Sequence, residues 1–374
     1  MTPITCALLD HGYTTQESAP CCHMHISNDE VDSFSKLHAS KHYIEIKQSM
    51  DNGVWHPKCH RCRIVEETTS TEIKSKRQCT NDYFRQYLDP ADNVGLVDLT
   101  LAPGFMCNLQ CRSCTPYLSS SWIKEELAMP LEIAQSKYAF RDQQARDTLK
   151  YNYADDDWST VRFANFLGGE PLYNPEFYVQ LEKLFNDTNG NCMLSITTNG
   201  TVRLDLKKYH WLGKFKTLNL CFSIDSTGRS FEFIRTGGIW DNVVKNIQFY
   251  KSMDFSSNGC TVGISSHLTA SILNILEINN TLDYLESMDI PVTTTQLTEP
   301  KHLTYSVLTD QEKQKIIEKI DGTKAGYLVP YMLTEQHNPT NRKNFLLYME
   351  HTKNYHDLDW KDYLPDLYNI MNTA

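Results

Sequence analysis

The chain has 374 residues, of which 40% are hydrophobic and 11% aromatic. This length corresponds to two or three domains of usual size and allows a large core, which excludes a small scaffold held together by disulfides. The composition is far from the charged, weakly hydrophobic profile of disordered chains, so we expect a globular fold. A net charge of −10 argues against a basic surface for nucleic acid or anionic membranes.

The sequence also argues against membrane insertion and secretion. No stretch approaches the roughly 20 consecutive apolar residues of a membrane-spanning helix, and the mean hydropathy of −0.47 agrees. The amino terminus has no basic segment and Asp10 interrupts its apolar run, so we expect no signal or transit peptide. These features predict a cytoplasmic protein with neither a membrane nor a nucleic-acid partner. In a reducing compartment, 12 cysteines are better interpreted as metal ligands than as disulfides.

The first segment, residues 1–90, is predicted to be a small metal-binding module. It is rich in Ser, Thr, Lys and His and has few long apolar runs, so a metal would replace the core that it lacks. The candidate ligands are Cys6, Cys21, Cys22, Cys59 and Cys62. We choose Cys21 over its neighbour Cys22, although either is suitable, and Cys79 could replace Cys6. A closed zinc site is one interpretation of these paired cysteines.

A second cysteine group follows a predicted strand at residues 97–102. It comprises Cys107, Cys111 and Cys114 in one eight-residue loop, after which a helix is expected near Pro116. A structural zinc centre needs four ligands, usually in separated pairs, so three local thiolates leave a metal site one ligand short. A four-iron cluster accepts this arrangement, because three cysteines can hold three corners and leave the fourth iron open to a small chelating molecule.

Strands and helices alternate through the central region, residues 91–298. Six strands are expected at about 97–102, 161–167, 192–198, 217–224, 260–265 and 290–295. Amphipathic helices are expected at about 174–186, 239–253 and 273–287. This alternation predicts an α/β fold with a parallel sheet, built as a partial (β/α)6 TIM-like barrel. Ligands of such folds bind at the carboxyl ends of the strands.

Polar residues and glycines follow three of these strands. They are Gly168, Gly169, Glu170, Asn199, Ser223, Asp225 and Arg235. The two glycines allow close backbone approach, and the carboxylate of Glu170 can accept a hydrogen bond from an ammonium group. Ser223 and Asp225 fall on one strand face by the two-residue period. Arg235 follows ten residues later and is suited to bidentate contact with a carboxylate.

The cysteine loop together with Gly-Gly-Glu resembles the radical S-adenosylmethionine (SAM) superfamily. The resemblance implies a 4Fe-4S cluster on Cys107, Cys111 and Cys114, with SAM on the open iron. It further implies that residues 168–170 bind the SAM amino group, that Asn199 borders the SAM pocket, and that Ser223, Asp225 and Arg235 meet its carboxylate and ribose. Ser113 stands where the family often has a larger residue, which leaves the adenine contact unassigned. The implied reaction is reductive cleavage of SAM to a 5′-deoxyadenosyl radical that abstracts hydrogen from a substrate.

The amino-terminal cysteines resemble those of twitch and SPASM-domain relatives, which carry an auxiliary iron–sulfur cluster. The resemblance implies an auxiliary 4Fe-4S cluster, with zinc as the alternative, and a substrate that is a peptide or a small metabolite. It also implies an electron donor such as flavodoxin or ferredoxin. The competing function is a zinc-binding structural or interaction protein without enzymatic activity.

Two further segments complete the predicted organisation. Residues 128–160 form a long connection where a substrate lid often lies, and Asp155, Asp156 and Asp157 within it are interpreted as a solvated cluster that starts a helix. Residues 299–374 are expected to form a helical cap, with one helix starting at the Thr-Asp-Gln-Glu capping sequence of residues 309–312.

Overall fold

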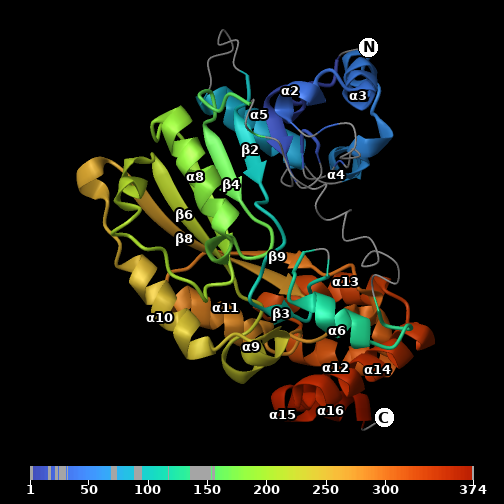
Figure 1. The fold of residues 1–374 in the computed structure, drawn as a ribbon. Helices are drawn as coiled ribbons and strands as arrows, with labels where there is room; N and C mark the ends of the chain where they lie inside the picture. Colours follow the sequence, from blue (N-terminus) through green and yellow to red (C-terminus); the bar gives the residue numbers. More distant parts are fainter. Residues whose placement is uncertain are drawn as a thin grey trace.

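A seven-stranded parallel sheet forms the centre of the computed structural model (Figure 1). The strands are β1 (Gly12–Thr14), β2 (Asp98–Leu101), β4 (Phe163–Phe166), β5 (Met193–Thr198), β6 (Thr217–Ser223), β8 (Thr261–Ala270) and β9 (Val292–Gln296), paired in that order. The structure describes residues 3–15, 18–21, 24, 31, 33–68, 74–87, 95–116, 118–134, 153 and 156–372. The sheet confirms the predicted α/β class and the partial TIM-like barrel.

The six predicted strands are confirmed, and the seventh, β1, comes from the amino-terminal segment. It pairs with β2 in parallel, with Gly12 opposite Asp98 and Tyr13 opposite Leu99. Three residues are too short to show an alternating pattern, so the sequence gives no signal for this strand. Part of the segment predicted as a separate module thus extends the sheet, while the proposed domain boundaries stay predictions.

The helices complete the alternation. Those of the first half are α1 (Ala7–His11), α2 (Phe34–Leu37), α3 (Lys41–Asp51), α4 (His60–Thr68), α5 (Lys76–Tyr87), α6 (Trp122–Ala128) and α8 (Pro175–Thr188). Those of the second half are α9 (Gly228–Ile234), α10 (Trp240–Lys251), α11 (Ile278–Ser287), α12 (Asp310–Ile320), α13 (Val329–Thr334), α14 (Pro339–His356), α15 (Trp360–Tyr363) and α16 (Pro365–Asn372). The predicted amphipathic segments correspond to α8, α10 and α11.

The two faces of the sheet differ because side chains alternate along each strand. One face carries apolar residues such as Ile196 and Phe222, which are buried in one core with α8 and α10. The other face carries polar, half-buried residues. On it, the Asn219 amide donates to Ser195 Oγ at 3.3 Å and to Ser265 Oγ at 3.2 Å. The polar face is therefore the lining of the half-barrel, where a ligand can bind.

The carboxy-terminal residues form the predicted helical cap. Thr309 and Glu312 make the expected capping box at the start of α12. A second core joins this region to α6 and to the end of β8, with Trp122, Leu268 and Tyr348 all buried in it. In Figure 1 the carboxy-terminal helices lie beside α6, far from the amino-terminal helices. None of the described helices is both long and apolar enough to span a bilayer.

The cysteine loop differs from the prediction in one respect. The helix expected near Pro116 begins at Trp122 as α6. The preceding serines bind the loop instead: Ser119 Oγ donates to Leu109 O at 3.0 Å, and Ser121 Oγ donates to Cys107 O at 2.5 Å. These bonds tie the turn that precedes α6 to the cysteine loop. Within the predicted lid, most of residues 135–155 lie outside the described part of the chain.

Candidate functional site

The cysteine loop leaves the carboxyl end of β2, as predicted. Its centre, β3 (Gln110–Cys111), pairs antiparallel with β7 (Arg235–Thr236), and this pairing sets Cys111 opposite Arg235. The indole N–H of Trp122 donates to Cys111 O at 3.1 Å. The loop is therefore held by the β3–β7 strand pair on one side and by α6 on the other.

The three thiols are buried or half-buried and lie within electrostatic reach of one another. Burial raises the pKa of Cys111 to about 11, with a contribution from the Cys107 charge. Burial, reinforced by the charges of Cys111 and Cys107, also raises the pKa of Cys114. A buried thiol loses its proton when a metal cation takes the proton's place. The loop therefore gathers three soft sulfur ligands that need such a cation.

Two of these sulfurs already accept hydrogen bonds from nitrogen. The Leu109 N–H donates to Cys107 Sγ at 3.4 Å, and Arg235 Nη1 donates to Cys111 Sγ at 3.5 Å. Such donors stabilise thiolates that bind an iron–sulfur cluster. Among the described residues, no three His, Cys, Asp or Glu side chains lie close enough to hold a single metal ion. Three cysteine thiols in one loop are a donor set that suits an iron–sulfur cluster, which takes cysteine thiolates as its ligands.

Gly168 and Gly169 lie against the start of the cysteine loop. A Cβ on Gly169 would lie 2.3 Å from Met106 O, and one on Gly168, whose φ is +116°, would lie 2.8 Å from Gly104 O. Backbone bonds join the same segments, from Gly169 N to Gly104 O at 3.1 Å and from Glu170 N to Met106 O at 2.8 Å. The close approach expected of these glycines is therefore made to the cysteine loop.

Glu170 is buried beside the end of β5. Its carboxylate accepts from the Thr198 hydroxyl at 2.7 Å and from the Asn199 N–H at 2.6 Å. Burial raises the pKa of Glu170 to about 7, although these hydrogen bonds lower it. The carboxylate thus lies at the predicted edge of the sheet and is poised between its charged and neutral forms at physiological pH.

Asn199 connects this edge to the cysteine loop. Its amide donates to Asn108 Oδ1 at 2.9 Å, and Cys107 Sγ lies 4.0 Å from the same nitrogen. Asn108 in turn donates to Thr201 Oγ1 at 2.8 Å. Neither Asn108 nor Thr201 is predictable as a site residue from the sequence, because ordinary polar loop residues carry no distinguishing signal.

Asp225 and Arg235 form an ion pair next to the cysteine loop. Arg235 Nη2 lies 2.8 Å from Asp225 Oδ2, and both side chains are nearly inaccessible to solvent. The Nε–H of Arg235 has no partner among the described residues although it is buried. Ser223, the last residue of β6, is half-buried at the same edge. Arg235 therefore places an unpaired, buried N–H beside the cysteine loop.

The amino-terminal cysteines form a second group. Cys6, Cys21, Cys59 and Cys62 line one pocket, together with Trp55 and Arg77. Burial and the charges of Cys6 and Cys62 raise the pKa of Cys59 to about 12. Cys79 is exposed and does not line this pocket, and Cys22 lies outside the described residues. The structure thus brings together the four cysteines chosen from the sequence.

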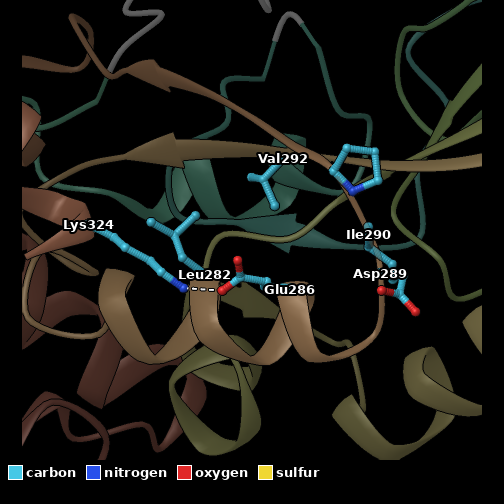
Figure 2. Close-up of a pocket in the computed structure, with 7 residues that line it drawn as sticks. Leu282, Glu286, Asp289, Ile290, Val292 and Lys324 are labelled. Atoms are coloured by element: carbon cyan, nitrogen blue, oxygen red, sulfur yellow. Dashed lines mark hydrogen bonds and ion pairs between the residues drawn. The ribbon is translucent and has the colours of Figure 1, made fainter.

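A separate groove of about 440 Å³ lies at the opposite end of the sheet. Leu282, Glu286, Ile290 and Val292 contribute to its lining, and Lys324 pairs with Glu286 at its edge (Figure 2). The groove adjoins the amino end of β9, whereas α/β folds bind ligands at the carboxyl ends. It lacks the cysteines and the carboxyl-end residues of the candidate site, so we assign it no part in the chemistry.

Comparison with known proteins finds one family that resembles the central region. Residues 101–277 match the family model described as the radical SAM superfamily. The matched segment covers just under half of the chain and includes the cysteine loop and the strands from β4 to β8. No curated protein matches the chain.

Solved structures give more distant likenesses. One is anSMEcpe with bound AdoMet and a Cp18Cys peptide, with 18% identity over 54% of this chain and 52% of that chain, and a TM-score of 0.35. Another is Streptococcus suis SuiB bound to S-adenosylmethionine, with 16% identity over 82% of this chain and 62% of that chain, and a TM-score of 0.34. The chain spans 52% and 62% of the length of the first two similar structures.

Proposed function

We propose that the protein is a radical SAM enzyme with a 4Fe-4S cluster on Cys107, Cys111 and Cys114. The observation that carries the proposal is three interacting thiols in one loop at the carboxyl edge of a parallel half-barrel. The match of residues 101–277 to the radical SAM family supports it independently. When bound, the cluster supplies the electron that cleaves SAM to methionine and a 5′-deoxyadenosyl radical.

The residues around the loop are proposed to bind and orient SAM. The Arg235 guanidinium, with one buried N–H unpaired, would take the carboxylate of SAM, and Glu170 would take its ammonium group. Asn199 borders the pocket from β5, and Ser223 and Asp225 border it from β6. The apolar core behind the strands and the loop packed over their ends keep water from the reacting atoms.

The four-cysteine pocket is proposed to hold an auxiliary 4Fe-4S cluster, as in twitch-type relatives. Arg77 lies in this pocket and lowers the pKa of Cys6 and Cys59 through its positive charge, against the larger effect of burial. A positive charge favours thiolates and therefore metal binding. Zinc bound by the same cysteines is the alternative, and metal analysis distinguishes the two.

A peptide is the proposed substrate, because relatives with auxiliary clusters commonly modify peptides and proteins. The polar lining of the half-barrel, with Asn219 at its centre, offers hydrogen-bonding groups to such a substrate. A ferredoxin or flavodoxin is proposed as the electron donor.

The test is anaerobic purification followed by iron and sulfide analysis and a SAM-cleavage assay with dithionite. We expect a brown protein that releases 5′-deoxyadenosine, and a Cys111→Ala variant that releases none. Cys260→Ala, which changes a buried cysteine of the core, serves as the matched control and should retain cleavage. A colourless wild-type protein with stoichiometric zinc would instead establish the non-enzymatic alternative.

A further inference from the structure

A buried ion pair lies directly behind the cysteine loop. Arg112, between the second and third cysteines, places Nη1 3.1 Å from Glu125 Oε1 of α6, and both side chains are 0% exposed. The Nε–H and Nη2–H of Arg112 donate to Thr236 Oγ1 at 3.1 and 2.8 Å. The guanidinium also lies over the ring of Trp122, 5.6 Å from its centre. The charge of Arg112 is thus fixed within the loop and paired with the carboxylate of Glu125.

Two histidines of the carboxy-terminal helix α14 complete this group. His356 Nε2 lies 2.7 Å from Glu125 Oε2, and His351 Nε2 lies 3.4 Å from Oε1. Gln110, beside Cys111, donates to Oε2 of the same carboxylate at 3.2 Å. Glu125 therefore binds both the cysteine loop and a helix that follows it in the chain by more than 200 residues.

A backbone carbonyl of the cysteine loop also contacts α14. The Tyr348 hydroxyl of α14 donates to Arg112 O at 3.5 Å. The contacts with His351 and His356 and the charge of Arg112 lower the pKa of Glu125 to about 2, against the larger opposing effect of burial. The carboxylate is accordingly ionised at neutral pH, and the loop carries a neutralised charge pair.

Stability alone is a weak explanation of this group. It lies in a core of apolar side chains that includes Trp122, Phe233 and Tyr348, and buried ion pairs often stabilise no better than apolar residues of similar volume. Such groups do fix geometry, because each partner left alone would be a costly buried charge. Here the fixed element is the segment that carries the three cysteines.

We propose that Glu125, held by His351 and His356, is a positioning residue that fixes the cysteine loop from behind and sets the electrostatic environment of its cluster. The carboxy-terminal helix α14 thereby takes part in cluster binding. This inference rests on the proposed function, because it requires a cluster on Cys107, Cys111 and Cys114.

Because Glu125 is charged, the proposal predicts the direction in which the midpoint potential of the cluster changes when Glu125 is replaced. In Glu125→Gln, the positive charge of Arg112 stays in the loop without compensation. A nearby positive charge stabilises the more negative, reduced cluster, so the midpoint potential should shift toward positive values. The loss of an anchor should also accelerate the release of iron to a chelator. A purely structural role for Glu125 would not shift the potential of protein that remains folded.

The experiment is a redox titration of the anaerobic full-length holoprotein, followed by EPR, together with the rate of iron release to a chelator and thermal unfolding. Glu350→Gln, which removes an exposed carboxylate from α14, is the matched control and should leave the potential and iron release unchanged. An unchanged potential and iron release in folded Glu125→Gln would overturn the proposal, as would an equal shift in Glu350→Gln.

If Glu125→Gln does not fold, the double variant His351→Ala/His356→Ala decides the matter. Faster iron release than in wild type supports the proposal when His351→Ala/His356→Gln, whose amide can donate to Glu125, restores the wild-type rate. Faster release without this rescue overturns it. Unchanged release overturns it. Wild-type protein that binds no iron would refute the proposed function itself, so the two failures are distinguishable.

Discussion

Arg235 stands opposite Cys111 in the short ladder of β3 and β7, and its guanidinium bridges the Cys111 sulfur and the Asp225 carboxylate. One arginine therefore connects the cysteine loop to the end of β6. The planar guanidinium is suited to this because it presents several N–H donors in fixed directions. The pairing of β3 with β7, two residues each, thus determines the position of the Arg235 guanidinium in the site.

This ion pair predicts a non-additive effect on stability. Arg235→Gln leaves Asp225 as a buried, unpaired carboxylate, so unfolding should cost about 3–5 kcal/mol less than in wild type. Asp225→Asn/Arg235→Gln removes both charges and should recover a large part of that loss. Chemical denaturation of Arg235→Gln, Asp225→Asn and the double variant measures the coupling free energy between the two side chains. Additive losses would show that the two side chains do not act as a pair.

Glu170 predicts a pH dependence of SAM binding. Because burial raises its pKa to about 7, the carboxylate is charged above this pH and neutral below it. An ammonium ligand needs the charged form, so affinity should fall as the pH decreases, by about tenfold between pH 8 and pH 6 for one proton.

Equilibrium dialysis of SAM with the holoprotein, its cluster kept oxidised so that SAM is not cleaved, measures this dependence at several pH values. Glu170→Gln should bind SAM weakly and without the slope, whereas Glu182→Gln, which changes an exposed residue of α8, should keep it. A slope shared by wild type and Glu170→Gln would assign the titration to another group.

The amino-terminal pocket predicts a defined change in iron content. If two 4Fe-4S clusters bind, wild-type protein should carry about eight irons. Cys59→Ala should reduce this number to about four and leave the EPR signal of the SAM-binding cluster in place. Cys79→Ala should change nothing, because Cys79 is exposed and outside the pocket. A wild-type count of about four irons with one zinc would support the alternative metal.

The sequence predicts those parts of the fold and site that depend on local patterns. The strand before the loop shows alternation, and Cys107, Cys111 and Cys114 show the spacing of the loop within eight residues. The partners of Glu125 are not predictable in this way. His351 and His356 are more than 200 residues away, and an acidic residue on a helix is usually exposed. Their meeting depends on how α14 packs on α6, which is a property of the tertiary structure.

Gly169 predicts that one methyl group would displace the cysteine loop. A Cβ at this position would lie 2.3 Å from Met106 O, so Gly169→Ala must move a backbone segment at a cost of about 3 kcal/mol. The movement affects the loop that carries Cys107, so iron retention and SAM cleavage should fall together with stability. Gly95→Ala is the matched control, because among the described residues its Cβ would meet only Thr160 Oγ1, at 3.5 Å. Thermal unfolding and iron analysis of both variants check the prediction, and equal behaviour of the two would show that the loop tolerates the added group.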